Sequence, residues 1–208
     1  MKKLLFMAAA LLLCVGMQAQ IVSSRSSIVR HESTPSNTQW YLRAGLGVMN
    51  LAGTEADANI GYNATFGFQK GLGGAGAYWG MEFGLGSRGC KVEDLKYIAH
   101  NVQYSPFTFG WKFNLVDDIA IDPHIGVFAS YDYTSKIKAN GESASWGDFA
   151  ESMGVDYNHF DVGMGIGVGI WYSRFNLDFA YQRGFVNAYS DVDKMQTSNF
   201  LIRLGVAF

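Results

Sequence analysis

A two-residue alternation of large apolar and small or polar side chains recurs in eight separate segments, and it constrains the fold more than any other feature. In 160–170, large apolar residues from Phe160 to Ile170 alternate with Asp161 and four glycines. Successive side chains of a β-strand point to opposite faces, so this period predicts a strand. The same period marks 40–48, 60–69, 79–86, 102–113, 121–133, 175–182 and 199–208.

The connections between these segments alternate in length. Short turns at 71–76, 114–118 and 173–174 alternate with longer polar segments at 87–97, 134–157 and 187–198, and 50–59 is intermediate. An even number of strands, each about 9–11 residues long or longer, with short turns on one side and long loops on the other, is typical of membrane-spanning barrels. The sequence therefore predicts an all-β fold, an eight-stranded antiparallel up-and-down transmembrane β-barrel over 39–208.

A soluble barrel with its apolar face inside is the competing interpretation. The apolar face carries many Trp and Phe side chains, among them Trp40, Phe83, Trp111 and Phe179. A lumen of eight strands is only just filled by ordinary side chains, so these rings do not fit inside it. The opposite face is rich in Gly, Ser, Thr and Asn, which suits a narrow lumen, and its glycines leave room for larger lumen residues such as Phe128 and Trp171.

The alternation slips by one residue at Ser105 and Pro106. A β-bulge absorbs such a slip, and it is also a place where a sheet tolerates proline. We therefore expect one continuous strand over 102–113 with a bulge at this point.

The N-terminal part of the chain has no two-residue period. Lys2 and Lys3 followed by an apolar run to Val15 predict a secretory signal peptide over 1–19. We expect a flexible periplasmic segment over 20–38. Cleavage there would leave Cys90 as the only cysteine, with no partner for a disulfide. The net charge of −2 provides no basic surface for nucleic acid.

The last segment, 199–208, is an apolar strand that ends on Phe208. Together with the signal peptide, the strand number and the loop asymmetry, this resembles the small eight-stranded outer-membrane β-barrel family, which includes porin-like and PorT-like proteins and the OmpA transmembrane domain. The resemblance implies the outer membrane of a Gram-negative bacterium. It implies that Phe208 is part of the signal read by the insertion machinery, with membrane lipids and lipopolysaccharide as surroundings.

Charged residues gather at one level of the predicted lumen. Counted from the turn-side end of each strand, they are Arg43, Glu82, Asp122, His124, Asp178 and Arg203, and Lys112 lies just below them. Unpaired charge is costly in so narrow a space, so we expect a paired network that closes the lumen, with Glu82 and Asp178 beside the two arginines. A wet channel lined by the same charges is the alternative.

Catalytic and metal-binding patterns are weak. None of the four histidines lies in the His-x-Ser-Asn arrangement of lipid A deacylases, and His124 and Ser130 are about 20 Å apart on one strand. The acidic residues of 134–157 lack calcium-loop spacing. We therefore predict a non-enzymatic protein with no cofactor and no metal.

The longest predicted external loop, 134–157, carries Trp146, Phe149 and Met153 outside any strand period. They are candidate contacts for an external ligand or envelope protein; a loop folded as a cap is the alternative. The predicted function is an outer-membrane barrel that acts through its loops or in envelope integrity. A PorT-like accessory of protein secretion, a narrow solute pore and a lipid A-modifying enzyme remain alternatives.

Overall fold

The computed structural model describes residues 38–52, 56–73, 76–92, 94–116, 118–139, 142–148, 154, 156–189 and 195–208. The predicted signal peptide and nearly all of the segment 20–38 lie outside these ranges. Within them there is no helix of the length and apolarity that a helical membrane span requires.

Ten strands among the described residues build one antiparallel sheet. They are β1 (Thr38–Ala52), β2 (Asn59–Gly71), β3 (Ala77–Val92), β4 (Leu95–Trp111), β5 (Phe113–Val116), β6 (Ile119–Ala139), β7 (Glu142–Ser145), β8 (Phe160–Tyr172), β9 (Phe175–Asn187) and β10 (Gln196–Ala207). β5 continues β4 along β6, and β7 folds back on the far end of β6.

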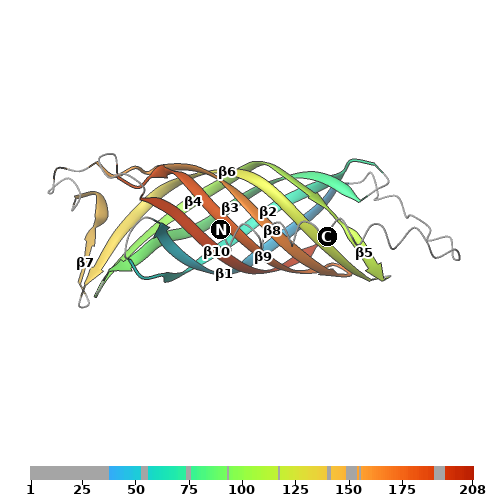
Figure 1. Cartoon of the computed structure of the whole chain (residues 1–208), viewed down its shortest axis with the longest axis horizontal. Coiled ribbons are helices and arrows are strands. Elements are labelled where there is room, and N and C mark those ends of the chain that lie inside the picture. Colours follow the sequence, from blue (N-terminus) through green and yellow to red (C-terminus); the bar gives the residue numbers. More distant parts are fainter. Residues whose placement is uncertain are drawn as a thin grey trace, which may run out of the picture. The chain divides into compact units, whose positions relative to one another are not determined.

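The sheet closes on itself. β1 pairs with β2 on one side and with β10 on the other, and β4 pairs with both β3 and β6. We call each continuous strand of the barrel wall a stave. β4 and β5 together count as one stave, and β7 is an addition to β6. The barrel wall then has eight staves, as predicted. Figure 1 shows these staves inclined to the long axis, with β5 at one end and β7 at the other.

The two faces of the wall are those that the alternation predicted. Ile166 and Phe83 turn outward with 60% and 58% of their surface exposed, whereas Arg43 and Asp178 turn inward and are buried. Glycines on the lumen side leave room for larger neighbours, as predicted. A Cβ on Gly163 would meet the ring of Phe128 at 2.6 Å.

Aromatic residues border the outward apolar band at both ends. On the turn side, Trp40 stacks on Phe66 with ring centroids 5.3 Å apart. On the loop side, Tyr62 and Tyr133 flank His100. Such rings mark the two membrane interfaces, so the membrane-spanning part of each stave lies between them, and the staves continue beyond the loop-side ring.

The expectation that 87–97 and 134–157 are loops throughout is wrong. β3 and β4 stay paired as far as Val92 and Leu95, so 87–97 is mostly a β-hairpin. β6 runs to Ala139 before turning into β7. The period of two fails here because five successive residues, from Gly86 to Cys90, are all buried. Gly89 also has a positive φ of 149°, a conformation that favours glycine.

The predicted bulge at Ser105 and Pro106 is confirmed. The register between β4 and β6 shifts between Tyr104 and Phe107, and Pro106 and Phe107 are both exposed. The bulge places the next residue, Thr108, back in the lumen. β4 therefore keeps its apolar side chains outward on both sides of the bulge, with Val102, Phe107 and Phe109 exposed.

Candidate functional site

Arg43 and Glu82 form the first half of a buried network in the lumen. The Nη1 of Arg43 lies 3.0 Å from the Oε1 of Glu82, and its Nε donates to Asn176 at 2.9 Å. The hydroxyl of Tyr41 donates to the same Oε1 at 2.7 Å. The positive charge from β1 is thus held by a carboxylate from β3 and an amide from β9.

Arg203 and Asp178 form the second half. The Nη2 of Arg203 lies 2.6 Å from the Oδ2 of Asp178, and its Nη1 lies 3.7 Å from the Oε2 of Glu82. His124 approaches the other oxygen of Asp178 at 3.5 Å. Glu82 therefore lies between two arginines, and the network reaches across the lumen from β3 through β10 to β9. We call Arg43, Glu82, Asp178 and Arg203 the inner network.

Asp122 and Lys112 lie apart from the inner network, nearer the turn side. Asp122 accepts hydrogen bonds from Tyr78 at 2.8 Å and from the indole of Trp171 at 2.9 Å. The Nζ of Lys112 donates to Gln39 at 3.0 Å and lies 3.9 Å from the ring centroid of Trp171. These residues form the floor of the lumen; no direct ion pair joins them to the inner network among the described residues.

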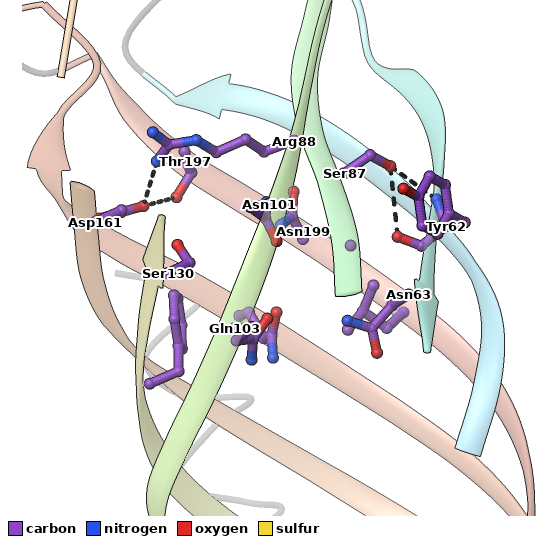
Figure 2. A pocket seen from close by; sticks show the side chains of 14 residues that line it. Tyr62, Asn63, Ser87, Arg88, Asn101, Gln103, Ser130, Asp161, Thr197 and Asn199 are labelled. Atoms are coloured by element: carbon purple, nitrogen blue, oxygen red, sulfur yellow. Dashed lines mark hydrogen bonds and ion pairs between the residues drawn. The ribbon is translucent and has the colours of Figure 1, made fainter. Parts of the chain in front are cut away.

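A second buried ion network lies towards the loop side, and the sequence did not predict it. Arg88 pairs with Asp132 at 2.7 Å. Arg88 also pairs with Asp161 at 3.1 Å, and Asp161 accepts a hydrogen bond from Thr197 (Figure 2). Asp132 also accepts a bond from Tyr157. The inward phase of Asp132 and Asp161 was readable from the sequence. Arg88 was assigned to a loop, so their partner was missed.

Amide side chains fill the space between the two networks. Figure 2 shows Asn63, Asn101, Gln103 and Asn199 directed into this section from several staves. Two cavities in the described part of the lumen are small. One lined by Asn63, Gln103 and their neighbours measures about 10 Å³, and one beside Glu82 and His124 measures about 30 Å³. Since a water molecule needs roughly 10–15 Å³ on this measure, each has room for about one or two waters.

An apolar cluster covers the loop-side mouth. Its buried members are Leu51, Cys90, Ile137, Trp146 and Ala188. Trp146 stacks on Tyr157 with centroids 5.0 Å apart, and its indole donates to the hydroxyl of Tyr189. We call this cluster the cap.

The burial of Trp146 bears on its two interpretations. Only 2% of its surface is exposed, so it packs inward rather than facing an external partner. Phe149 and Met153 lie outside the described residues. Burial raises the pKa of the Cys90 thiol to about 11 and that of Tyr189 to about 12.

The histidines and Phe208 are the remaining residues that the sequence analysis considered. His100 contacts Tyr62, and the Nδ1 atoms of His124 and His159 lie near the backbone oxygens of Asp122 and Asp132. No serine hydroxyl bonds to a histidine in the described part of the chain, and no three His, Cys, Asp or Glu residues there are grouped around a metal position. Phe208 is 72% exposed, stacks on Phe66 and donates its N–H to Trp40.

Comparisons with known proteins place this geometry in a family. The model of the outer membrane protein beta-barrel domain matches residues 7–208. No curated protein matches the chain.

Three solved structures illustrate the likeness of fold. The outer-membrane enzyme PagL has a TM-score of 0.52 at 10% identity, over 80% of this chain and 98% of that one. Neisserial surface protein A has a TM-score of 0.47 at 10% identity, over 82% and 97%. The attachment invasion locus protein Ail of Yersinia pestis has a TM-score of 0.42 at 16% identity, over 82% and 97%.

Proposed function

Since this chain belongs to the outer-membrane protein β-barrel family and is a protein of the Gram-negative outer membrane, we propose that it is a non-enzymatic barrel with a sealed lumen. In this role the wall anchors the protein and the networks close its interior. Its activity lies in the staves and hairpins that extend beyond the membrane, through contact with envelope components or support of envelope integrity.

The inner network is the main observation that supports this proposal. Four charged side chains from β1, β3, β9 and β10 meet across one level of the lumen, and the cavity beside them holds about 30 Å³. A steady current needs a continuous file of water. Here the floor, the inner network, the amides, the Arg88 network and the cap follow one another along the axis and interrupt such a file.

The pore alternative requires these layers to open together. Each buried arginine is held by a carboxylate in a site where an unpaired charge is costly. Opening the inner network means moving Arg43 or Arg203 away from Glu82 and Asp178 without a replacement anion. That cost favours a closed barrel over a narrow solute pore.

The alternative that the protein is an enzyme rests on the likeness of its fold to that of PagL. At 10% identity, this likeness assigns no role to any residue of this chain. A deacylase needs a serine activated by a histidine that an acidic group orients. The described histidines are engaged by Tyr62, Asp178 and backbone oxygens instead. This supports the non-enzymatic proposal. Lipid A of unchanged acyl content in cells that overproduce the protein is the expected mass-spectrometric result.

Conductance across planar bilayers tests the sealed lumen. The unmodified protein should give no steady current, whereas Glu82→Ala, which frees Arg43, should give flickering or leaking barrels. Phe83→Leu is the matched control, because Phe83 is the next residue and faces the lipid; it should stay silent. Large, stable channels from the unmodified protein would overturn the proposal.

A deletion strain tests the cellular role. Cells that lack the protein should become more sensitive to detergent or lose an adhesion phenotype while protein secretion continues. A selective secretion defect, together with co-purification of secretion components, would favour the PorT-like accessory role instead.

A further inference from the structure

Four lysines project from the outer surface of the barrel on three neighbouring staves, beyond the loop-side aromatic ring. Lys91 on β3 is the register partner of Lys96 on β4, and Lys96 is the partner of Lys138 on β6. Lys136 lies two residues from Lys138 on the same face. Lys96, Lys136 and Lys138 are exposed. We call these four residues the lysine ladder.

The lysine ladder destabilises the folded barrel when no anion is bound to it. Like charges directly opposite one another in a sheet destabilise it, and none of the four lysines has an ion-pair partner within the described ranges. Asp57 lies beside Lys91 through two backbone hydrogen bonds, but Lys96 and Lys138 face each other in register. An anion between them would remove this repulsion.

The height of the ladder fits the headgroup level of the outer leaflet. Tyr133 and His100 belong to the aromatic ring at the membrane interface. Lys136 follows Tyr133 by three residues on β6, about 10 Å along the strand. In Figure 1, β4 and β6 run to the same end of the barrel as β7.

An apolar hollow on the membrane side of the ring extends over these three staves and onto β1, β2 and β8 beside them. It measures about 700 Å³, and its wall includes Phe83, Leu85, Val102, Tyr104 and Ala129. Phe83 and Tyr104 stack along one side with centroids 4.5 Å apart. Ala129 and Tyr131 of this hollow precede Lys136 on β6, so one molecule with an anionic head and apolar chains can span both features.

We propose that this face of β3, β4 and β6 binds one lipopolysaccharide molecule of the outer leaflet. The lysine ladder holds phosphate groups of its lipid A headgroup as point charges, and the hollow takes its acyl chains. This goes beyond the sealed lumen, because it assigns a ligand to the outer surface of the barrel.

Thermal unfolding in detergent micelles tests the site, with bisphosphorylated lipid A as the probe. A ligand that binds only the folded barrel raises its Tm. Lys96→Gln with Lys138→Gln should weaken lipid A binding by about 30-fold, the loss expected for two surface lysines. Without lipid A this variant should unfold at the same or a higher temperature, since its repulsion is gone.

The matched control removes the same charge elsewhere. Lys70→Gln with Arg174→Gln changes two exposed cations at the turn side and should leave lipid A binding unchanged. Equal loss in this control, or full stabilisation of the ladder variant by lipid A, would refute the site.

Two further experiments distinguish binding of the lipid A headgroup from binding of its acyl chains. Ala129→Phe, which fills part of the hollow, should weaken lipid A binding without altering the response to inorganic phosphate. Dephosphorylated lipid A should bind the unmodified protein and the ladder variant equally weakly. If inorganic phosphate alone stabilises the unmodified protein as much as lipid A does, the ladder binds free anions and the lipopolysaccharide assignment fails.

Discussion

The hydroxyl of Tyr41 reaches the Oε1 of Glu82 at 2.7 Å across a strand that separates them. Gly67 on β2 is the register partner of both residues. A Cβ at Gly67 would lie 3.0 Å from the Tyr41 hydroxyl and from the Cγ of Glu82. The missing side chain therefore creates the space in which Glu82 can accept from Tyr41 and Arg43 together.

Replacing Glu82 with Ala should lower the free energy of unfolding by about 3–5 kcal/mol, because Arg43 is left buried without its carboxylate. Urea unfolding of the protein in lipid vesicles measures this loss. Glu82→Gln keeps an acceptor for Tyr41 and should lose less. Equal stability of the alanine variant and the unmodified protein would show that the pair contributes nothing.

Two glycines on the lumen face of β8 should respond differently to the same change. A Cβ on Gly167 would meet the Nε2 of His124 at 2.5 Å, whereas one on Gly165 finds its nearest atom at 3.4 Å. Gly167→Ala should therefore cost about 1–3 kcal/mol through overpacking, and Gly165→Ala should cost much less. Parallel unfolding curves of the two variants check this, and equal curves would contradict the tight packing at His124.

Ile166→Arg should impair the barrel by about 2–4 kcal/mol, because Ile166 faces the acyl chains near mid-depth. Folding yield in vesicles and the midpoint of urea unfolding both report the effect. Ile166→Leu keeps an apolar side chain at the same place and serves as the control. If arginine is tolerated as well as leucine, Ile166 does not face lipid.

Cys90 should react slowly with alkylating reagents in the folded barrel. Its thiol is buried in the cap with a pKa of about 11, so almost no thiolate exists at pH 8, and labelling should accelerate as the pH rises towards 11. Trp146→Ala, which opens the cap, should speed labelling at pH 8. Cys90→Ser provides the blank, and rapid labelling of the unmodified protein would contradict the cap.

Phe208→Ser should reduce the amount of assembled protein in cells. The resemblance of the last strand to closing strands of outer-membrane barrels implies that the insertion machinery reads this aromatic residue. Refolding of the purified variant in detergent should remain efficient, since Phe208 is largely exposed and makes few contacts. Normal assembly in cells, judged by heat-modifiable migration in gels, would oppose the signal role.

The sequence predicted the wall well because each stave has one lipid face and one lumen face. Phe83 and Glu82 are neighbours in the chain with opposite environments, so a period of two separates them. The slip at Pro106 was visible for the same reason. Arg43 and Glu82 could be placed at one level by counting, although the distances between them could not.

The region beyond the membrane was predicted poorly, because both faces of β3 are buried from Gly86 to Cys90. Arg88 lies among five consecutive buried residues, and no alternation reveals its direction. Trp146 packs on Tyr157 and Tyr189 through a fold-back of β7 that has no strand period of its own. Lys96 and Lys138 become neighbours only through the register of β4 and β6.

The pairing of β1 with β10 closes the barrel, and it can form only after β10 has been synthesised. β10 is the last stave to be synthesised, and it pairs with β1 from Tyr41 and Ala207 to Ala52 and Gln196. The hydrogen bond from Arg203 to Asn63 joins residues 140 positions apart. Long-range pairings of this kind form slowly and leave strand edges exposed in the meantime. A chain truncated before β10 therefore leaves the edges of β1 and β9 without their partner, and such unpaired edges favour aggregation.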